Sequence, residues 1–338
     1  MITDLSMKNF KAFEDEALEL GSLTILTGLN SSGKSSAIQA LRLINEGKTL
    51  AGLGSLREYV RNDSSESSIA CTQKTKNSRK ELRLSFNRHS AIICSNDKHL
   101  ADIVSYISAD RLGPRNTLPL SISNDVQTVG NDGENIIDFL HIVETGDSVL
   151  LVPAALALSG TGVRNNIQEW LRVISPGVKF DYERYVHADM GRTEFNGHRS
   201  VHVGYGLSCT LPIIASILVH ASQLSAGDIK TALLLLENPE VHLHPSGQTK
   251  MGEMLAYAAS CGLQIIVETH SDHLLNGVRI AIKEGKLRHT DAKCYFFKAD
   301  AASAPTKVER LTIDQYGMLD HWPDGFFDEM EKSLMQLI

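Results

Sequence analysis

One stretch of the sequence has the residue types and spacing of a phosphate-binding loop. Residues 28–35 read Gly-Leu-Asn-Ser-Ser-Gly-Lys-Ser, which fits the pattern GxxxxGK followed by Ser or Thr. The glycines let the backbone wrap so that its N–H groups point at phosphate oxygens, while Lys34 neutralises phosphate charge and the Ser35 hydroxyl is placed for Mg²⁺. The stretch predicts a site for a nucleoside triphosphate, with binding residues Gly28, Asn30, Ser31, Ser32, Gly33, Lys34, Ser35 and Ser36.

Carboxylates follow a second apolar run, in the order Leu236-Glu237-Asn238-Pro239-Glu240. In P-loop ATPases a strand of this kind delivers one carboxylate to the magnesium shell, and Glu237 has that position. The next position usually holds the glutamate that orients the attacking water, but Asn238 is an amide and cannot accept a proton. Either Glu240 acts as the base, or turnover is slow and ATP mainly holds a conformation.

A third apolar run ends in Glu268-Thr269-His270-Ser271-Asp272-His273. A histidine at this point can reach the γ-phosphate and sense whether it is present, and we assign that role to His270. The nearby His242, His244 and His273 have spacings that also occur in metal sites. No cysteine joins them, so we favour polar histidines at an interface.

A second phosphate cradle is predicted where Gly204-Tyr205-Gly206-Leu207-Ser208 leads into an apolar helix. Two glycines, the Ser208 hydroxyl and a helix N-terminus together favour an anion. Since one chain has one triphosphate loop, a second cradle indicates a second copy, with Ser208 acting across a dimer.

Short apolar runs place these residues on an α/β framework. Residues 23–26, 233–236 and 265–267 are typical of strands buried on both faces of a mostly parallel sheet. Helical spacing follows the first two runs, and residues 67–95 alternate as in an antiparallel meander. The middle, residues 129–198, predicts one helix near residues 166–174 and glycine-rich loops, without the heptads of coiled-coil arms.

Composition is that of an ordinary folded protein, with 42% hydrophobic and 22% charged residues. The formal charge of -7 excludes a wholly basic nucleic-acid binder. No apolar run reaches the ~20 residues of a membrane span, which predicts a cytoplasmic protein without a membrane partner.

The five cysteines are scattered singly and predict reduced, mostly buried thiols. The basic group Lys74, Lys76, Arg79 and Lys80 is expected to be a solvated hairpin loop, with a phosphate-backbone contact as the alternative.

The order of these motifs resembles the ABC-type ATPases of the SMC, RecF and OLD group. Residues 9–13, Asn-Phe-Lys-Ala-Phe, resemble their N-terminal strand pair, whose loop lies near the nucleotide base or ribose and brings in Lys11 and Phe13. The resemblance implies an ATP sandwich between two copies, with Ser208 as the signature serine, His270 as the switch histidine and residues 242–245 touching the partner. Residues 106–115 occupy the place of the Q-loop, without a glutamine.

Glu-Asn-Pro-Glu, His-Leu-His-Pro and the ending at residues 322–328 resemble a bacterial branch with an uncharacterised C-terminal domain. Relatives work in phage defence or DNA maintenance, often beside a separate nuclease, as ATPases of the Septu kind do. OLD enzymes continue into a Toprim nuclease, whereas this chain ends about 65 residues after His273, fewer than the ~100 of such a domain. The resemblance therefore implies a separate effector such as a nuclease, and leaves nucleic acid open as a partner.

We expect a single ABC-type head over residues 1–338. Its parts are a phosphate-loop lobe with the meander (1–128), a helical signature lobe (129–225), a core with the carboxylates and switch histidine (226–300) and a C-terminal cap (301–338). The function expected is an ATPase switch whose dimer, or a higher homo-oligomer, controls an effector. The alternative is a slow or non-hydrolysing nucleotide sensor or scaffold. A small-molecule kinase ranks lower, because such kinases need no signature serine.

Overall fold

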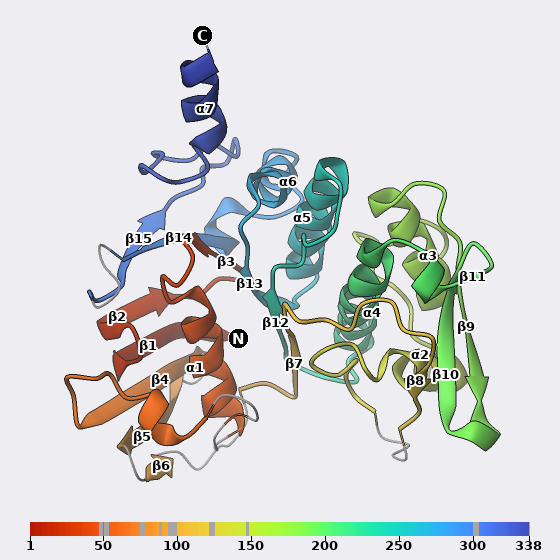
Figure 1. Ribbon diagram of the computed structural model, residues 1–338, viewed down its shortest axis with the longest axis horizontal. Helices are drawn as coiled ribbons and strands as arrows, with labels where there is room; N and C mark the ends of the chain where they lie inside the picture. Colours follow the sequence, from red (N-terminus) through yellow and green to blue (C-terminus); the bar gives the residue numbers. More distant parts are fainter. Residues whose placement is uncertain are drawn as a thin grey trace. The chain divides into compact units, whose positions relative to one another are not determined.

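The computed structural model describes residues 1–46, 50, 54–74, 79–87, 90–93, 100–121, 126–146, 149–299 and 304–337. The chain forms two compact units, coloured by sequence in Figure 1. Unit 1 combines Met1–Asp102 with Arg288–Ile338, and unit 2 is Ile103–Leu287. Unit 2 is therefore one continuous segment, whereas unit 1 is built from both ends of the chain.

The first sheet of unit 1 is antiparallel, in the order β2-β1-β4-β5-β6. Its strands are β1 (Ile2–Phe10), β2 (Phe13–Glu19), β4 (Glu66–Lys74), β5 (Arg79–Asn87) and β6 (Ala91–Ile93). Alternate residues such as Leu5, Met7 and Leu84 are buried on one face. The predicted meander is confirmed, and Lys74 pairs with Arg79 at the end of its hairpin. Lys76 and Cys94 lie outside the described residues.

The phosphate-loop strand of unit 1 belongs to a second group of strands. β3 (Leu23–Gly28) pairs in parallel with β14 (Ala292–Lys298), which pairs antiparallel with β15 (Lys307–Leu311). α1 (Lys34–Glu46) follows β3 and contacts β1, β3, β4 and β5. The short η1 (Leu56–Glu58) precedes β4, η4 (His289–Asp291) precedes β14, and α7 (Glu329–Leu337) ends the described chain.

The core of unit 2 is a parallel sheet in which β12 (Ala232–Glu237) lies between β7 (Ile103–Ile107) and β13 (Gln264–Glu268). The helices α3 (Val163–Ile174), α4 (Tyr205–Ala226), α5 (Pro245–Ser260) and α6 (Asp272–Lys283) complete this core, and α5 packs closely on α6. The predicted strands at residues 233–236 and 265–267 are confirmed, as is the helix near residue 166. Because core pairs in both units are mostly parallel, the predicted mixed sheet is also confirmed.

A small antiparallel sheet in unit 2 was missing from the prediction of helix and loops for residues 129–198. β10 (Met190–Phe195) pairs with β8 (Leu118–Pro119), β9 (Phe180–Tyr185) and β11 (His198–Arg199). The short η2 (Val186–Ala188) and η3 (Ser200–His202) flank these strands, and α2 (Ile136–Thr145) contacts β9 and β10. Asn196 and Gly197 both have positive φ between β10 and β11, as a tight hairpin turn requires.

α4 corrects the expectation that no apolar segment reaches membrane-spanning length. It has 22 residues with a mean hydropathy of 1.5, enough by length and composition alone, but 78% of the tested window is buried inside the protein. Residues on every side of it are buried, among them Ile213, Ile217 and His220. A helix that is apolar all round and covered by its own chain is a core helix.

Candidate functional site

The phosphate loop of unit 1 has the wrapped backbone that its sequence predicts. It connects β3 to α1, and Gly28, Ser31 and Gly33 have φ values of +139°, +61° and +99°. A Cβ on Gly28 would lie 2.1 Å from the carbonyl oxygen of Phe297 in β14. One on Gly33 would lie 3.1 Å from Phe13 and from the Thr306 hydroxyl, so only glycine fits both positions.

Lys34 begins α1 and is buried, with 3% of its surface exposed. Its ammonium donates hydrogen bonds to the carbonyl oxygens of Gly28 (3.2 Å) and Leu29 (2.7 Å). The amine therefore lies over the concave side of its own loop, where a phosphate would need it. Asn30 and Ser31 are exposed at the tip, and Ser35 and Ser36 are half-buried in the first turn of α1.

Lys11 lies in the turn between β1 and β2, and Phe13 is the first residue of β2. The Lys11 ammonium contacts Gln39 of α1 and lies 5.0 Å from the centre of the Tyr59 ring. Burial lowers the pKa of Lys11, and the charge of Glu58 partly opposes that shift. Phe13 is fully buried and meets Phe297 edge to face at 6.2 Å. The Phe13 ring thus lies next to Gly33, and because it is buried it offers no exposed face to a nucleotide base.

In unit 2, the predicted carboxylate strand and the predicted strand that precedes His270 end side by side. Glu237 of β12 is in register with Glu268 of β13, and Leu236 is in register with Ile107 of β7. Glu237 is half-buried, and its Oε2 accepts a 3.4 Å hydrogen bond from the Ala109 N–H. The backbone turns sharply after it, because Asn238 has a φ of +45°.

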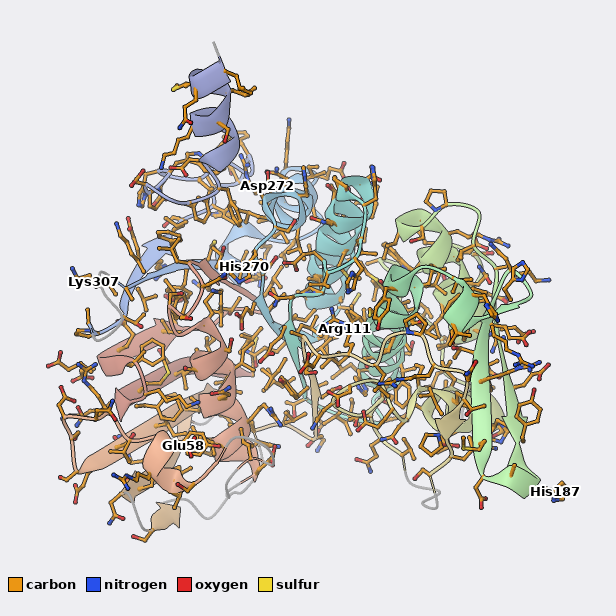
Figure 2. All side chains as sticks on the ribbon, in the orientation of Figure 1. Glu58, Arg111, His187, His270, Asp272 and Lys307 are labelled. Carbon is orange, nitrogen blue, oxygen red and sulfur yellow. The ribbon has the colours of Figure 1, made fainter. Side chains whose placement is uncertain are left out.

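Arg111, which Figure 2 labels, lies in the predicted Q-loop region and fixes this turn. Its guanidinium donates 2.7 Å hydrogen bonds to the carbonyl oxygens of Ser108, Glu237 and Asn238, and only 6% of the residue is exposed. It also contacts the Cys209 thiol in the first turns of α4. Burial lowers the pKa of Arg111, and Cys209, Glu240 and Glu237 oppose that shift. The sequence motifs gave Arg111 no role of its own, because its partners are backbone carbonyl oxygens and two of them lie far away in the sequence.

Glu240 and His270 are brought together. The Oε1 atom of Glu240 accepts a 2.8 Å hydrogen bond from the His270 N–H, and Oε2 is buried without a hydrogen-bond partner. Burial raises the pKa of Glu240, while backbone N–H groups, Thr269 and Arg111 act in the other direction. The His270 side chain itself is exposed. The arrangement places a buried carboxylate and an exposed imidazole together, just after the carboxyl end of β13.

Ser208 does not have the outward position expected of it. It lies in the first turns of α4, where its Oγ is buried and has no hydrogen-bond partner. It lines a cavity of about 20 Å³ within unit 2, together with Leu112 and Pro212. This placement argues against Ser208 as the group that reaches a phosphate on another copy. The exposed residues at the start of α4 are Gly204, its N-cap, and Tyr205.

The loop that follows the carboxylates meets the start of α4. The Tyr205 ring, 55% exposed, lies 5.1 Å from the His242 ring. His244 caps α5, since its Nδ1 accepts the Ser246 N–H at 3.3 Å. His273 lies in the first turn of α6. Among the described residues, no group of three or more His, Cys, Asp or Glu side chains could hold a metal ion.

The described cysteines Cys71, Cys209, Cys261 and Cys294 are free thiols.

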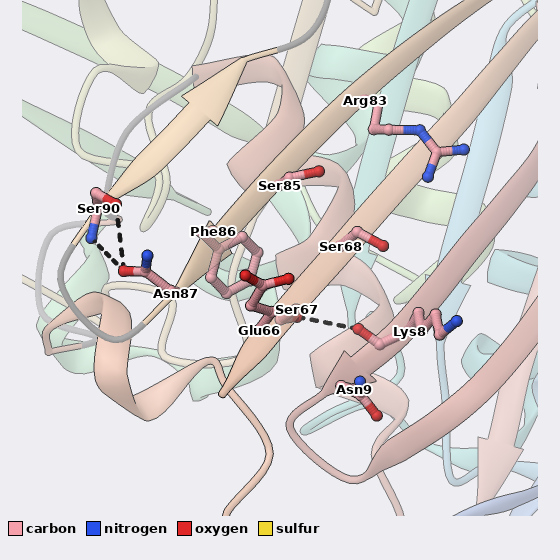
Figure 3. Close-up of a pocket in the computed structure, with 10 residues that line it drawn as sticks. All are labelled: Lys8, Asn9, Glu66, Ser67, Ser68, Arg83, Ser85, Phe86, Asn87 and Ser90. Carbon is pink, nitrogen blue, oxygen red and sulfur yellow. Dashed lines mark hydrogen bonds between the residues drawn. The ribbon is translucent and has the colours of Figure 1, made fainter. Parts of the chain in front are cut away.

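A separate groove of about 390 Å³ lies on unit 1, on the side of β1, β4 and β5 shown in Figure 3. It is polar, with the Ser67 hydroxyl bonded to the Lys8 carbonyl oxygen and Asn87 bonded to Ser90. None of the predicted site residues lines it.

Comparisons with known proteins agree with this geometry. A family model described as "AAA ATPase domain" matches residues 1–147 and 163–275, and one described as "Protein of unknown function (DUF3696)" matches residues 287–337. No curated protein was found to match the chain.

Solved structures show the same fold at low identity. The chain resembles the "SmcHead bound to the C-winged helix domain of ScpA" with a TM-score of 0.57 and 12% identity, over 93% of this chain and 98% of that chain. For an Smc head domain bound to the C-terminal domain of ScpA, derived from Pyrococcus furiosus, the TM-score is 0.56 and the identity 12%, over 99% of each chain. For RecF-ATPrS, in the RecFOR pathway, they are 0.52 and 14%, over 92% of this chain and 98% of that chain.

The predicted resemblance to SMC heads and RecF, with an uncharacterised C-terminal domain, is therefore confirmed. Because the first family model covers more than half of the sequence, the chain belongs to the AAA ATPase domain family.

Proposed function

We propose that this protein is a cytoplasmic switch that binds and hydrolyses ATP and dimerises around two ATP molecules. The observation that carries the proposal is the phosphate loop, with its three positive φ values and the buried Lys34 over its concave side. These features fit a triphosphate, since they supply backbone N–H groups and a charge where phosphate oxygens need them.

The residues predicted from the sequence supply the chemical groups that ATP and Mg²⁺ would need. Lys34 and the loop N–H groups would bind the phosphates, exchanging the Gly28 and Leu29 carbonyls for phosphate oxygens. Ser35 and Glu237 have the oxygen ligands that Mg²⁺ prefers. When bound, Mg²⁺ would neutralise charge on the phosphate oxygens. Lys11 would stay with Gln39 of α1.

Glu240 is the better candidate for the base that accepts a proton from water. It is a carboxylate, its environment raises its pKa, and it touches the backbone of His270. Asn238 lacks a basic group, and its buried Oδ1 has no hydrogen-bond partner, which suits an acceptor that orients a water. His270 would sense the γ-phosphate.

For the dimer, the start of α4 replaces Ser208 as the group facing the second copy. Gly204 caps the helix without a side-chain hydrogen bond, so the first N–H groups of α4 stay available for an anion. An Smc head is bound to a partner protein, ScpA, in one similar structure. We extend the proposal to an effector such as a nuclease, with a role in phage defence, and to nucleic acid.

The test measures ATP turnover with Mg²⁺ and the native mass with and without a non-hydrolysable ATP analogue. We expect turnover, and a dimer only with the analogue. Lys34→Ala should weaken ATP binding by roughly 100-fold, because it removes a buried phosphate-facing charge. The control is Lys8→Ala on the exposed side of β1. Wild-type protein that never binds ATP, or Lys34→Ala protein that dimerises normally with it, would refute the proposal. Proteins that co-purify with the native complex would identify the effector.

A non-hydrolysing nucleotide sensor is the second candidate, and Asn238 is the observation that favours it. In that case the wild-type protein would bind ATP with near-zero turnover, and Asn238→Glu would raise it.

A further inference from the structure

Thr306 is one of the residues through which the C-terminal segment reaches the phosphate loop of unit 1. Thr306 immediately precedes β15, next to Lys307, which Figure 2 labels. It lies in the segment matched by the family of unknown function, residues 287–337. Only 6% of it is exposed.

Thr306 joins two loops whose sequences predict contacts with the nucleotide. Its hydroxyl donates a 2.8 Å hydrogen bond to the carbonyl oxygen of Ser32, directly before Gly33 and Lys34. Its N–H donates a 2.9 Å hydrogen bond to the carbonyl oxygen of Ala12, between Lys11 and Phe13. One buried residue therefore fixes the spacing of both loops.

The Ser32 bond has a direct effect on the loop's donors. In a trans peptide the C=O and the following N–H point in opposite directions. Holding the Ser32 oxygen on Thr306 therefore aims the Gly33 N–H away from Thr306. Gly33 is also packed against Phe13 and the Thr306 hydroxyl, which leaves this peptide little room to rotate.

β14 of the same segment supports the start of the loop. The Leu29 N–H donates to the Phe297 carbonyl oxygen at 3.3 Å, and Gly28 lies against the Phe297 backbone. The segment thus contacts the loop at Gly28 and Leu29 on one side and at Ser32 and Gly33 on the other.

We propose that Thr306 is a positioning residue through which the C-terminal segment sets the affinity of the phosphate loop for ATP. The inference rests on the proposed ATP binding and gives the segment a role in it. Thr306 acts on the loop that holds the phosphates and not on the carboxylates, so it affects nucleotide affinity and leaves the turnover of bound nucleotide unchanged.

A matched pair of variants tests the hydroxyl. Thr306→Val keeps the branched shape and removes the hydrogen bond, whereas Thr306→Ser keeps the bond. ATP affinity is measured by titration with a fluorescent ATP analogue. We expect Thr306→Val to weaken binding by about five- to tenfold, with kcat at saturating ATP within about twofold of wild type, and Thr306→Ser to restore affinity. Thr312→Val, an exposed threonine on the same segment, is the control.

Hydrogen–deuterium exchange of the peptide containing Ser32 is the second measurement, and it needs no nucleotide. It should speed up in Thr306→Val and not in Thr306→Ser. If wild-type protein binds ATP and Thr306→Val binds it equally well, the inference is wrong and the proposed function stands. If wild-type protein binds no ATP, both are wrong.

Discussion

The phosphate loop of unit 1 and the carboxylate cluster of unit 2 are built in opposite ways. The loop takes its shape from backbone geometry, with Gly28 and Gly33 pressed against neighbours and its carbonyls bonded to Lys34 and Thr306. The cluster takes its shape from side chains, and the Oδ1 of Asn238 and the Oε2 of Glu240 are buried without hydrogen-bond partners. An unsatisfied buried polar atom costs about 1–3 kcal/mol.

This difference predicts that the phosphate loop determines nucleotide affinity, whereas the carboxylate cluster determines the rate of hydrolysis. A cradle made of backbone changes little when one side chain is altered, apart from Lys34 and Thr306. A cluster with unused hydrogen-bonding capacity is arranged for a group that arrives later, such as a water or a phosphate. Changes in unit 2 should therefore alter turnover while nucleotide affinity stays the same.

The largest effect is expected at Glu240. Glu240→Gln should lower kcat by roughly 100- to 10,000-fold, because the amide cannot accept a proton, with ATP affinity unchanged. Turnover needs the ionised carboxylate, and burial raises its pKa. The activity of wild-type protein should therefore fall with decreasing pH around a midpoint above the ordinary range of a glutamate.

Steady-state kinetics across pH and nucleotide titrations test the Glu240 prediction. Glu253→Gln is a matched control, since Glu253 is a similarly buried carboxylate on α5 paired with Lys250. Full activity in Glu240→Gln would remove Glu240 from the chemistry.

Arg111 should have an intermediate effect. Arg111→Met removes three hydrogen bonds that hold the turn after Glu237, and we expect kcat to fall about 10- to 100-fold with ATP affinity little changed. Arg111→Lys should recover part of the activity, because it keeps the charge but not the planar fork. Added guanidinium should restore Arg111→Met further. If affinity and kcat fell together with the melting temperature, Arg111 would serve stability alone.

The smallest effect is expected at Ser208. Because its hydroxyl is buried without a partner, Ser208→Ala should leave ATPase activity unchanged and alter stability by about 1 kcal/mol or less, in the stabilising direction. Ser216→Ala is the matched control, since Ser216 is also buried on α4 with an unpartnered hydroxyl. Thermal melting and ATPase assays compare the two. Loss of activity in Ser208→Ala alone would restore the signature-serine role.

The sequence was sufficient for the parts whose signal is local. A pattern of glycines, Lys34 and a buried strand is read from adjacent residues, and apolar runs mark the parallel strands in the same way. The small sheet around β10 was missed because its strands are short and mostly half-exposed, although Asn196-Gly197 is a recognisable hairpin signal.

The roles of Arg111 and Thr306 were missed for a different reason. Both donate hydrogen bonds to backbone carbonyl oxygens of residues far away in the sequence. Because every residue has a backbone carbonyl, the residue type at that position does not reveal the contact. The direction of the Ser208 hydroxyl is similarly hidden, since the motif predicts a helix start but not which of its residues turns inward.

The parallel pairing of Gly28 with Phe297 has a consequence for synthesis of the protein. Unit 2 is translated as one uninterrupted segment, whereas β3 has to wait for β14, which is made only after all of unit 2. Until then the nucleotide loop lacks the strand on which Gly28 and Leu29 rest. We therefore expect a nascent chain, or one shortened before β14, to lack this support for its nucleotide loop, so that bound nucleotide reports that β14 has been made and has paired with β3.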